Sequence, residues 1–259
     1  MPASSENLEI LANIRQVDGE YEVATTPTPH GGIFGAYQLF QLVLVAELAA
    51  PGKRVISVQT VFANGGESGK PARIKVETLQ NGRSFAFLTL TYFQGDVVIS
   101  RNEIMLTVDE DDFLHHRNPG APPVDLPSWE LTQPGMWPGQ ARHWQGSGAE
   151  VASLHYWLDE QPSATMTRAL LALVTEPAVM ASMREFNVMP EASAGRMAGN
   201  VLVQTITLLE PADLVAGIVL RSTTRYVGQG RIHGEGNIVD VTGQLLATYS
   251  TTGVLRFPR

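Results

Sequence analysis

Hydrophobic and polar positions follow two different periods along this chain. The run from Gly32 to Ala50 is apolar on nearly all sides and ends at Pro51-Gly52, which predicts a buried helix. The segments after it are rich in β-branched and aromatic residues and are bounded by turn residues, as is typical of strands. We therefore expect a short strand before the helix and four longer ones after it, over 20–24, 55–63, 72–79, 84–94 and 97–108.

The second half of the chain repeats this order of elements. A strand is expected over 152–158 and a helix over 162–183 with Ser163 as its cap, followed by strands over 200–209, 214–226, 230–241 and 244–257. The segment from Val108 to Gln145 is rich in charge and proline and has little periodicity, which predicts a linker or a surface crossing. The expected domains are 1–108, a linker over 109–145, and 146–259.

Two short matches between the halves indicate duplication. Val58-Gln59-Thr60 and Val203-Gln204-Thr205 lie in corresponding predicted strands. Gly82-Arg83 precedes the turn at Gly95 by 13 residues, and Gly230-Arg231 precedes the turn at Gly243 by the same 13 residues. Because one helix on one sheet leaves apolar surface exposed, a second copy would cover it. The sequence predicts an α+β protein of two tandem repeats, each a long antiparallel sheet wrapped around a central helix: a double hot-dog.

Three segments carry a resemblance to a known family. They are the turn and helix start His30–Ala36, the stretch Val76–Ser100 with its Asn-Gly-Arg-Ser and Gln-Gly turn, and the C-terminal hairpin Val241–Phe257. With them the chain resembles the type II acyl-CoA thioesterases, which are double hot-dog hydrolases, over most of its length outside the linker. The resemblance implies an acyl-CoA thioesterase that hydrolyses a fatty-acyl or related thioester with a carboxylate-oriented water.

The resemblance also implies positions for the catalytic groups. In the family a carboxylate, a hydroxyl residue and a glutamine hold the attacking water. Glu176 matches the carboxylate, and Thr251 stands where the family has glutamine. Spacing from Glu176 puts Asn200 at the hydroxyl position, whereas alignment on Pro211 puts Val201 there. These departures leave an alternative, a non-hydrolytic protein that binds acyl-CoA or another hydrophobic ligand with a degenerate catalytic set.

Elementary chemistry gives two of these segments candidate roles. Glu176 precedes Pro177, so the helix should end or bend there. A carboxyl group among apolar residues has a raised pKa, which suits a general base near neutral pH, while the alternative is a solvated glutamate at a helix end. The turn His30-Gly31-Gly32-Ile33 opens the first helix, where free amides can stabilise an oxyanion. Its alternative is an ordinary turn, with His30 structural rather than an acid or a substrate contact.

Composition narrows the remaining possibilities. The 259 residues have a formal charge of −8, which argues against general nucleic-acid binding. The absence of Cys excludes disulfides, thiolate metal sites and Cys nucleophiles. The Asp, Glu and His residues of 109–116 fit no metal-site spacing, no Gly-x-Ser-x-Gly elbow is present, and no phosphate-binding glycine pattern occurs. We therefore expect no metal and no cofactor.

Other expectations concern location, partners and specific side chains. The N-terminus lacks the features of a signal peptide and the apolar run is too short to span a bilayer, so we expect a cytoplasmic protein without membrane contact. Sheets of this type often pair through their edges, which allows a homodimer.

A polyanionic coenzyme A would need a local basic patch, for which Arg83, Arg101, Arg225 and Arg231 are available. A hydratase of the same fold is a third option, but no Asp-x-x-x-x-His occurs at a helix start.

Two sets of large side chains have two interpretations each. Gln38 and Gln41 share one face of the first helix, and they either line a cavity or, as we expect, bind the backbone of the partner half. The four tryptophans lie in or just beyond the linker, and they either pin it onto the sheet or line an acyl pocket: Trp129, Trp137, Trp144 and Trp157.

Overall fold

Two compact units make up the protein, as seen in a computed structural model. The structure describes residues 4–28, 30–111, 113–114, 116, 130–132, 139–144, 151–176, 178 and 198–256. The first unit comprises residues 1–116, 136–138 and 162–174, and the second comprises residues 117–135, 139–161 and 175–259.

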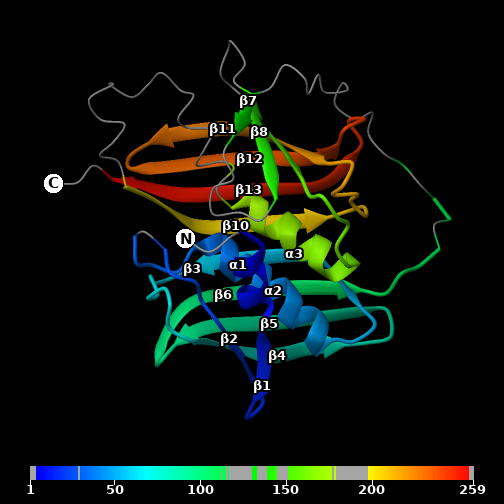
Figure 1. Cartoon of the computed structure of the whole chain (residues 1–259). Helices are drawn as coiled ribbons and strands as arrows, with labels where there is room; N and C mark the ends of the chain where they lie inside the picture. The colour runs from blue at the N-terminus through cyan, green and yellow to red at the C-terminus, as the bar shows by residue number, and fades with distance from the viewer. Residues whose placement is uncertain are drawn as a thin grey trace. The chain divides into compact units, whose positions relative to one another are not determined.

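Within residues 4–111, the first unit is an antiparallel sheet with two helices (Figure 1). The helices are α1 (Ser4–Ala12) and α2 (Gly35–Ala49). The strands run in the spatial order β1-β2-β4-β5-β6-β3, and their bounds are β1 Ile14–Val17, β2 Glu20–Val23, β3 Arg54–Phe62, β4 Ala72–Asn81, β5 Phe85–Gln94 and β6 Val97–Thr107. The predicted strands over 20–24, 55–63, 72–79, 84–94 and 97–108 are confirmed within about two residues, whereas α1 and β1 had no counterpart among the predicted elements.

Helix α2 is buried on all sides, as the unbroken apolar pattern predicted. Every residue from Ala36 to Ala46 is buried, and the helix packs against strands β3 to β6. It begins at Gly35 rather than Gly32 because the residues before it are bonded to another segment. The Ile33 amide donates to the Gly66 carbonyl at 3.0 Å, and Gly32 forms a β-bridge with Glu67. No helix among the described residues is long and apolar enough to cross a membrane.

The two buried glutamines of α2 bind groups of the first unit, not backbone of the other half. Gln41 donates to the carbonyls of Leu11 and Ala24 at 3.2 and 2.7 Å, and its own oxygen accepts from Tyr92. Gln38 accepts from Ser100 at 2.9 Å. The Gln41 amide is thus satisfied within the first unit, so the expectation that it contacts the partner half was wrong.

The strands of the second unit are also antiparallel to their neighbours, and they are drawn in yellow, orange, red and green in Figure 1. Its order is β10-β13-β12-β11-β9-β8-β7, with bounds β7 Glu130–Thr132, β8 Gln140–Trp144, β9 Val151–Trp157, β10 Ala198–Leu208, β11 Ile218–Gly228, β12 Arg231–Asp240 and β13 Leu245–Arg256. Strand β11 starts four residues later than predicted because Asp213 accepts from the amides of Val215 and Ala216 and holds a turn there. Strands β7 and β8 lie inside the predicted linker, so that segment contributes to the sheet.

Helix α3 (Ala164–Thr175) begins as predicted, with the Ser163 hydroxyl accepting from the Met166 amide at 3.3 Å. Its residues 164–174 belong to the first unit and Thr175 to the second. The boundaries at 108 and 146 therefore stay a prediction about the sequence repeat and do not describe how the chain packs. The last residues of the predicted helix, 179–183, lie outside the described part of the chain, as do Trp129, Trp137, Asp112 and His115.

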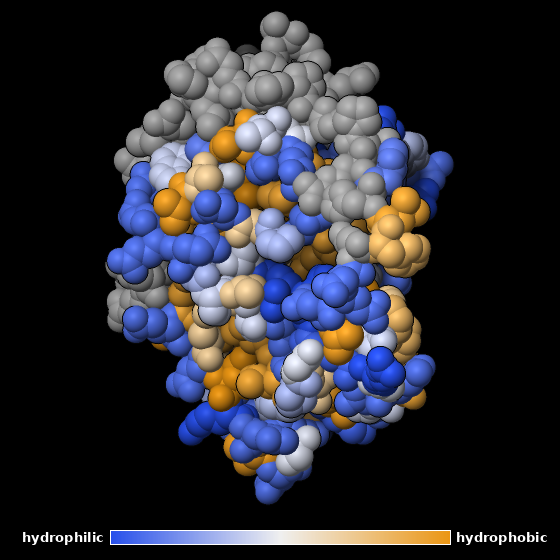
Figure 2. All heavy atoms as spheres, turned by 90° about the vertical axis from the view of Figure 1, so that its right-hand side faces the viewer, coloured by the Kyte–Doolittle hydropathy of each residue, from blue (hydrophilic) through white to orange (hydrophobic). Residues whose placement is uncertain are grey.

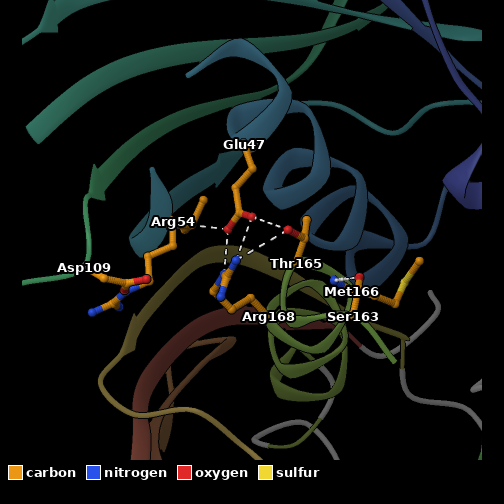
Figure 3. Close-up of polar contacts among 8 residues, drawn as sticks. Glu47, Arg54, Asp109, Ser163, Thr165, Met166 and Arg168 are labelled. Carbon is orange, nitrogen blue, oxygen red and sulfur yellow. Dashed lines mark hydrogen bonds and ion pairs between the residues drawn. The ribbon is translucent and has the colours of Figure 1, made fainter. Parts of the chain in front are cut away.

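A largely buried ion pair anchors the start of α3 to the end of α2 (Figure 3). The Glu47 carboxylate accepts from Arg168 Nε at 2.6 Å and from Arg168 Nη2 at 2.8 Å. It also accepts from the Thr165 hydroxyl at 2.5 Å and the Val55 amide at 3.0 Å. Burial alone would raise the pKa of Glu47, but these four donors outweigh it and hold the pKa below its usual value. The first turns of α3 are thus fixed against α2.

On the face drawn in Figure 2, orange hydrophobic atoms form several patches among blue hydrophilic ones.

The Val-Gln-Thr tripeptides that match between the two halves of the sequence differ in burial between the two units. Gln59 on β3 is exposed, whereas Gln204 on β10 is completely buried. Because side chains alternate along a strand, a matching tripeptide does not by itself place equivalent residues on the same face.

Candidate active site

Glu176 directly follows the last residue of α3 and is buried. The helix ends at Thr175 because Pro177 cannot continue it. Glu176 is 6% exposed, and Leu173, Val174 and Ala178, which are close to it in the sequence, are also buried. Desolvation by burial raises the pKa of Glu176 from 4.5 to about 8. The carboxyl group is therefore not a solvated group at a helix end, and near neutral pH it can both hold and release a proton.

A polar cluster inside the second unit adjoins this carboxyl group along the chain. Thr251 on β13 lies directly opposite Gln204 on β10. The Thr251 hydroxyl donates to the Gln204 side-chain oxygen, and the Gln204 amide donates to the Thr175 hydroxyl at 3.2 Å. All three side chains are at most 1% exposed. Thr175 is the residue before Glu176, so the cluster meets the end of α3 that carries the carboxyl group.

Asn200 is not part of this cluster. It is exposed near the start of β10 and pairs with Val254, three residues beyond Thr251. Its alternative in the alignment, Val201, is buried but carries no hydroxyl. A bulge between Val201 and Val203 shifts the register of β10, so counting residues from Glu176 could not place a side chain on the inner face.

Gln204 is the residue of the cluster that sequence reasoning missed. In the sequence, Gln204 is noted only as part of the tripeptide that indicates the internal repeat. The signal for its burial was present, because Gln204, Ile206 and Leu208 alternate with less buried residues along β10. The resemblance implied a glutamine at position 251. The chain has threonine there and a glutamine directly across the strand pair.

The turn before α2 does not offer the free amides that the sequence suggested. The Gly31 amide donates to the Thr28 carbonyl at 3.0 Å, the Gly32 amide to His30 Nδ1 at 3.1 Å, and the Ile33 amide to Gly66. His30 itself is exposed. The amides of Gly35 and Ala36, in the first turn of α2, are the ones without an intrahelical acceptor.

The remaining candidate groups form no further site among the described residues. No group of three or more Asp, Glu and His side chains there could hold a metal ion. Arg225 pairs with Glu235 and Arg231 binds Gln229, while Arg83 and Arg101 are exposed. Trp157 stacks on His155 within β9. The chemistry at hand is therefore that of a buried carboxyl group, a hydroxyl group and a carboxamide.

Comparison with known proteins gives these groups a family context. Residues 24–108 match the model of the acyl-CoA thioesterase N-terminal domain. No curated protein sequence matches the chain.

Solved structures match over nearly the whole chain. Acyl-CoA thioesterase II TesB2 from Mycobacterium marinum has a TM-score of 0.77 at 17% identity, and the match covers 97% of each chain. A putative thioesterase II from Thermobifida fusca has a TM-score of 0.77 at 16% identity, with 99% of each chain covered. The dehydratase domain from the CurJ module of Curacin polyketide synthase is less similar, with a TM-score of 0.58 at 13% identity, covering 98% of this chain and 90% of that one. At such identities the likeness shows the fold, and the predicted double hot-dog is confirmed. The chain thus has the double hot-dog fold seen in solved thioesterase II structures, and its residues 24–108 match the acyl-CoA thioesterase N-terminal domain.

Proposed function

We propose that this protein is an acyl-CoA thioesterase that hydrolyses a fatty-acyl or related thioester. The observation that carries the proposal is Glu176, a buried carboxyl group with a pKa raised to about 8, next in sequence to a cluster of buried hydroxyl and amide groups. The match of residues 24–108 to an acyl-CoA thioesterase domain supports the same substrate class.

The proposed reaction uses Glu176 as general base. Its carboxylate takes one proton from a water molecule while the water oxygen bonds to the thioester carbonyl carbon. The Thr251 hydroxyl oxygen accepts a hydrogen bond from the second O–H group of this water, and this bond fixes the orientation of the water. The tetrahedral intermediate then breaks its carbon–sulfur bond, and the proton held by Glu176 passes to the leaving thiolate. The products are a carboxylic acid and free coenzyme A.

The roles of the other predicted residues are narrower. Asn200 is exposed and away from Thr251, so we no longer assign it to catalysis. For the turn His30–Ile33 we retain only a contact with substrate, because its amides already have acceptors. His30→Ala is then expected to raise KM and leave kcat within about twofold, since uniform binding energy affects KM alone.

The test is the release of free thiol by the purified full chain from acyl-CoAs of short, medium and long acyl length. Glu176→Gln should lower kcat by at least about 100-fold, the range of general-base catalysis. Thr251→Val should also lower it, and Glu110→Gln, an exposed glutamate, is the matched control. Absence of turnover with every thioester would overturn the proposal. Saturable acyl-CoA binding without turnover would instead identify a non-hydrolytic ligand-binding protein.

Oligomeric state and location belong to the same proposal. We propose a cytoplasmic homodimer, since sheet edges of this fold type often pair. Light scattering of the purified protein should give twice the 28.1 kDa mass of the chain. A mass of one chain at all concentrations would exclude the dimer without affecting the proposed chemistry.

A further inference from the structure

The side chain of Gln204 is held at both ends. Its oxygen accepts from the Thr251 hydroxyl, and its nitrogen donates to the Thr175 hydroxyl at 3.2 Å. The Gln204 side chain is 0% exposed, so bulk water does not compete for either group. An amide nitrogen can only donate and an amide oxygen can only accept. In the structure the carboxamide oxygen faces Thr251 and the carboxamide nitrogen faces Thr175.

This arrangement uses the single hydrogen of the Thr251 hydroxyl. A threonine hydroxyl has one donor and two acceptor lone pairs. Once its hydrogen is given to Gln204, Thr251 can interact with another molecule only as an acceptor. A thioester carbonyl oxygen has no hydrogen to donate, whereas water has two. Thr251 is thereby matched to water and mismatched to the carbonyl oxygen of a substrate.

We infer that Gln204 is a positioning residue for hydrolysis, which sets the polarity of the Thr251 hydroxyl so that its oxygen accepts from the attacking water. The inference rests on the proposed thioester hydrolysis and adds a residue to it. Gln204 touches Thr251 and Thr175 and acts on the water through Thr251. Without Gln204, the Thr251 hydrogen is free to rotate toward the water or the thioester carbonyl, and the water loses an acceptor that orients it.

The competing explanation is that Gln204 only fills space and satisfies polar groups in the interior. The chain provides a matched control for it in Gln59, which occupies the same Val-Gln-Thr tripeptide on β3 but is exposed. Replacing Gln204 by Met keeps the length of the side chain and removes both its donor and its acceptor. Replacing it by Glu keeps an acceptor for Thr251.

The experiment is a double-mutant cycle on the full chain with an acyl-CoA that the wild-type protein hydrolyses. Gln204→Met should lower kcat by about 10- to 100-fold, the scale of a misoriented reactant, with KM within about threefold. Gln204→Glu should retain most of the activity lost in Gln204→Met, and Gln59→Met should match the wild type. Thr251→Val combined with Gln204→Met should be no slower than Thr251→Val alone, because the two residues act as a unit. Thr251→Ser should stay within about threefold of the wild type.

The outcomes separate this inference from the proposed function. No turnover by the wild-type protein overturns the proposed function itself. If the wild type is active and Gln204→Met, folded by circular dichroism, keeps the same kcat, the inference is wrong. The inference is also wrong if the fold-losses in kcat of Gln204→Met and Thr251→Val multiply in the double variant. If Gln204→Met does not fold, Gln204→Glu provides the test. A folded Gln204→Glu protein with a kcat as low as that of Thr251→Val would overturn the inference.

Discussion

The carboxyl group of Glu176 should control the pH dependence of activity. Burial raises its pKa to about 8, so most molecules carry it protonated at neutral pH. Only the ionised form can take a proton from water. We therefore expect kcat/KM to rise with pH, with a midpoint near pH 8, measured as thiol release after subtraction of spontaneous hydrolysis. A pH-independent rate between pH 6 and 9 in the wild type would contradict the assignment of Glu176 as base.

The same carboxyl group should make the stability of the protein depend on pH. The pKa of this carboxyl group is 4.5 when it is solvated and about 8 in the folded protein. Between these two values the unfolded chain loses the proton while the native protein keeps it, so the free energy of unfolding falls as pH rises through this window. Glu176→Gln removes this dependence. In urea unfolding at pH 5 and pH 8, the variant should gain stability relative to the wild type at pH 8. An equal difference in unfolding free energy between variant and wild type at both pH values would contradict the raised pKa of Glu176.

At the scale of single residues, sequence reasoning found part of the site. Glu176 was found by resemblance together with the helix-ending proline and the apolar neighbours visible in the sequence, and Thr251 was found by resemblance alone. Gln204 was missed although it shares its alternation with the apolar Ile206 and Leu208, whereas Asn200 was misplaced for a physical reason. The inner face of β10 depends on the bulge between Val201 and Val203, which changes the alternation without changing any residue type.

At the scale of elements, most strands and both long helices could be predicted because their apolar patterns are strong, as alternation in the strands and as a continuous apolar run in α2. Strands β7 and β8 could not, since they are only 3 and 5 residues long and lie in a segment dominated by proline and charge. Helix α1 has a weak amphipathic pattern in a polar N-terminal segment. Such elements form only because a neighbour supplies their pairing or packing surface, and one sequence does not show that neighbour.

The ion pair between α2 and α3 should contribute strongly to the stability of the first unit. Glu47 and Arg168 are 8% and 19% exposed, and Glu47→Gln leaves the guanidinium without its charged partner. Loss of one member of a buried pair costs about 3 kcal/mol of unfolding free energy. The control is Glu77→Gln, which removes an ion pair with Lys75 that is half exposed and should cost less than about 0.5 kcal/mol. Equal effects in urea unfolding would contradict this account.

Gly236 on β12 provides the space for a contact across the second sheet. The Tyr249 hydroxyl on β13 bonds Ser222 on β11 at 2.6 Å, and a Cβ at position 236 would lie 2.3 Å from the Tyr249 ring and 2.4 Å from the Arg221 carbonyl oxygen. Because the carbonyl oxygen cannot move aside without displacing its strand, Gly236→Ala should destabilise the protein by about 2 kcal/mol.

The control for Gly236→Ala is Gly65→Ala, whose added Cβ meets nothing within 4 Å. It should change the free energy of unfolding by less than about 0.5 kcal/mol, as is usual for surface positions. Thermal unfolding followed by circular dichroism measures both variants. A wild-type melting temperature in Gly236→Ala would show that Tyr249 leaves this position at little cost.

At the scale of the whole molecule, the sequence repeat and the packing units divide the chain differently. The repeat predicts separation near residues 108 and 146, but residues 162–174 pack with residues 1–116. A polypeptide of residues 1–116 therefore lacks Arg168 and Thr165, and it leaves the Glu47 carboxylate without its cation. It also lacks the apolar side of α3 that includes Leu170 and Leu173, both buried in the full chain.

We expect residues 1–116, expressed alone, to show no cooperative unfolding transition in urea, and residues 1–145 to behave in the same way. Co-expression of residues 1–145 with residues 146–259 should restore a cooperative transition, because the second polypeptide supplies α3. Glu47→Gln in the first polypeptide should weaken this association, since the Glu47–Arg168 pair then joins two separate chains. Cooperative unfolding of residues 1–116 alone, at the midpoint of the full chain, would show that the repeat is autonomous and that α3 adds no stability to the first unit.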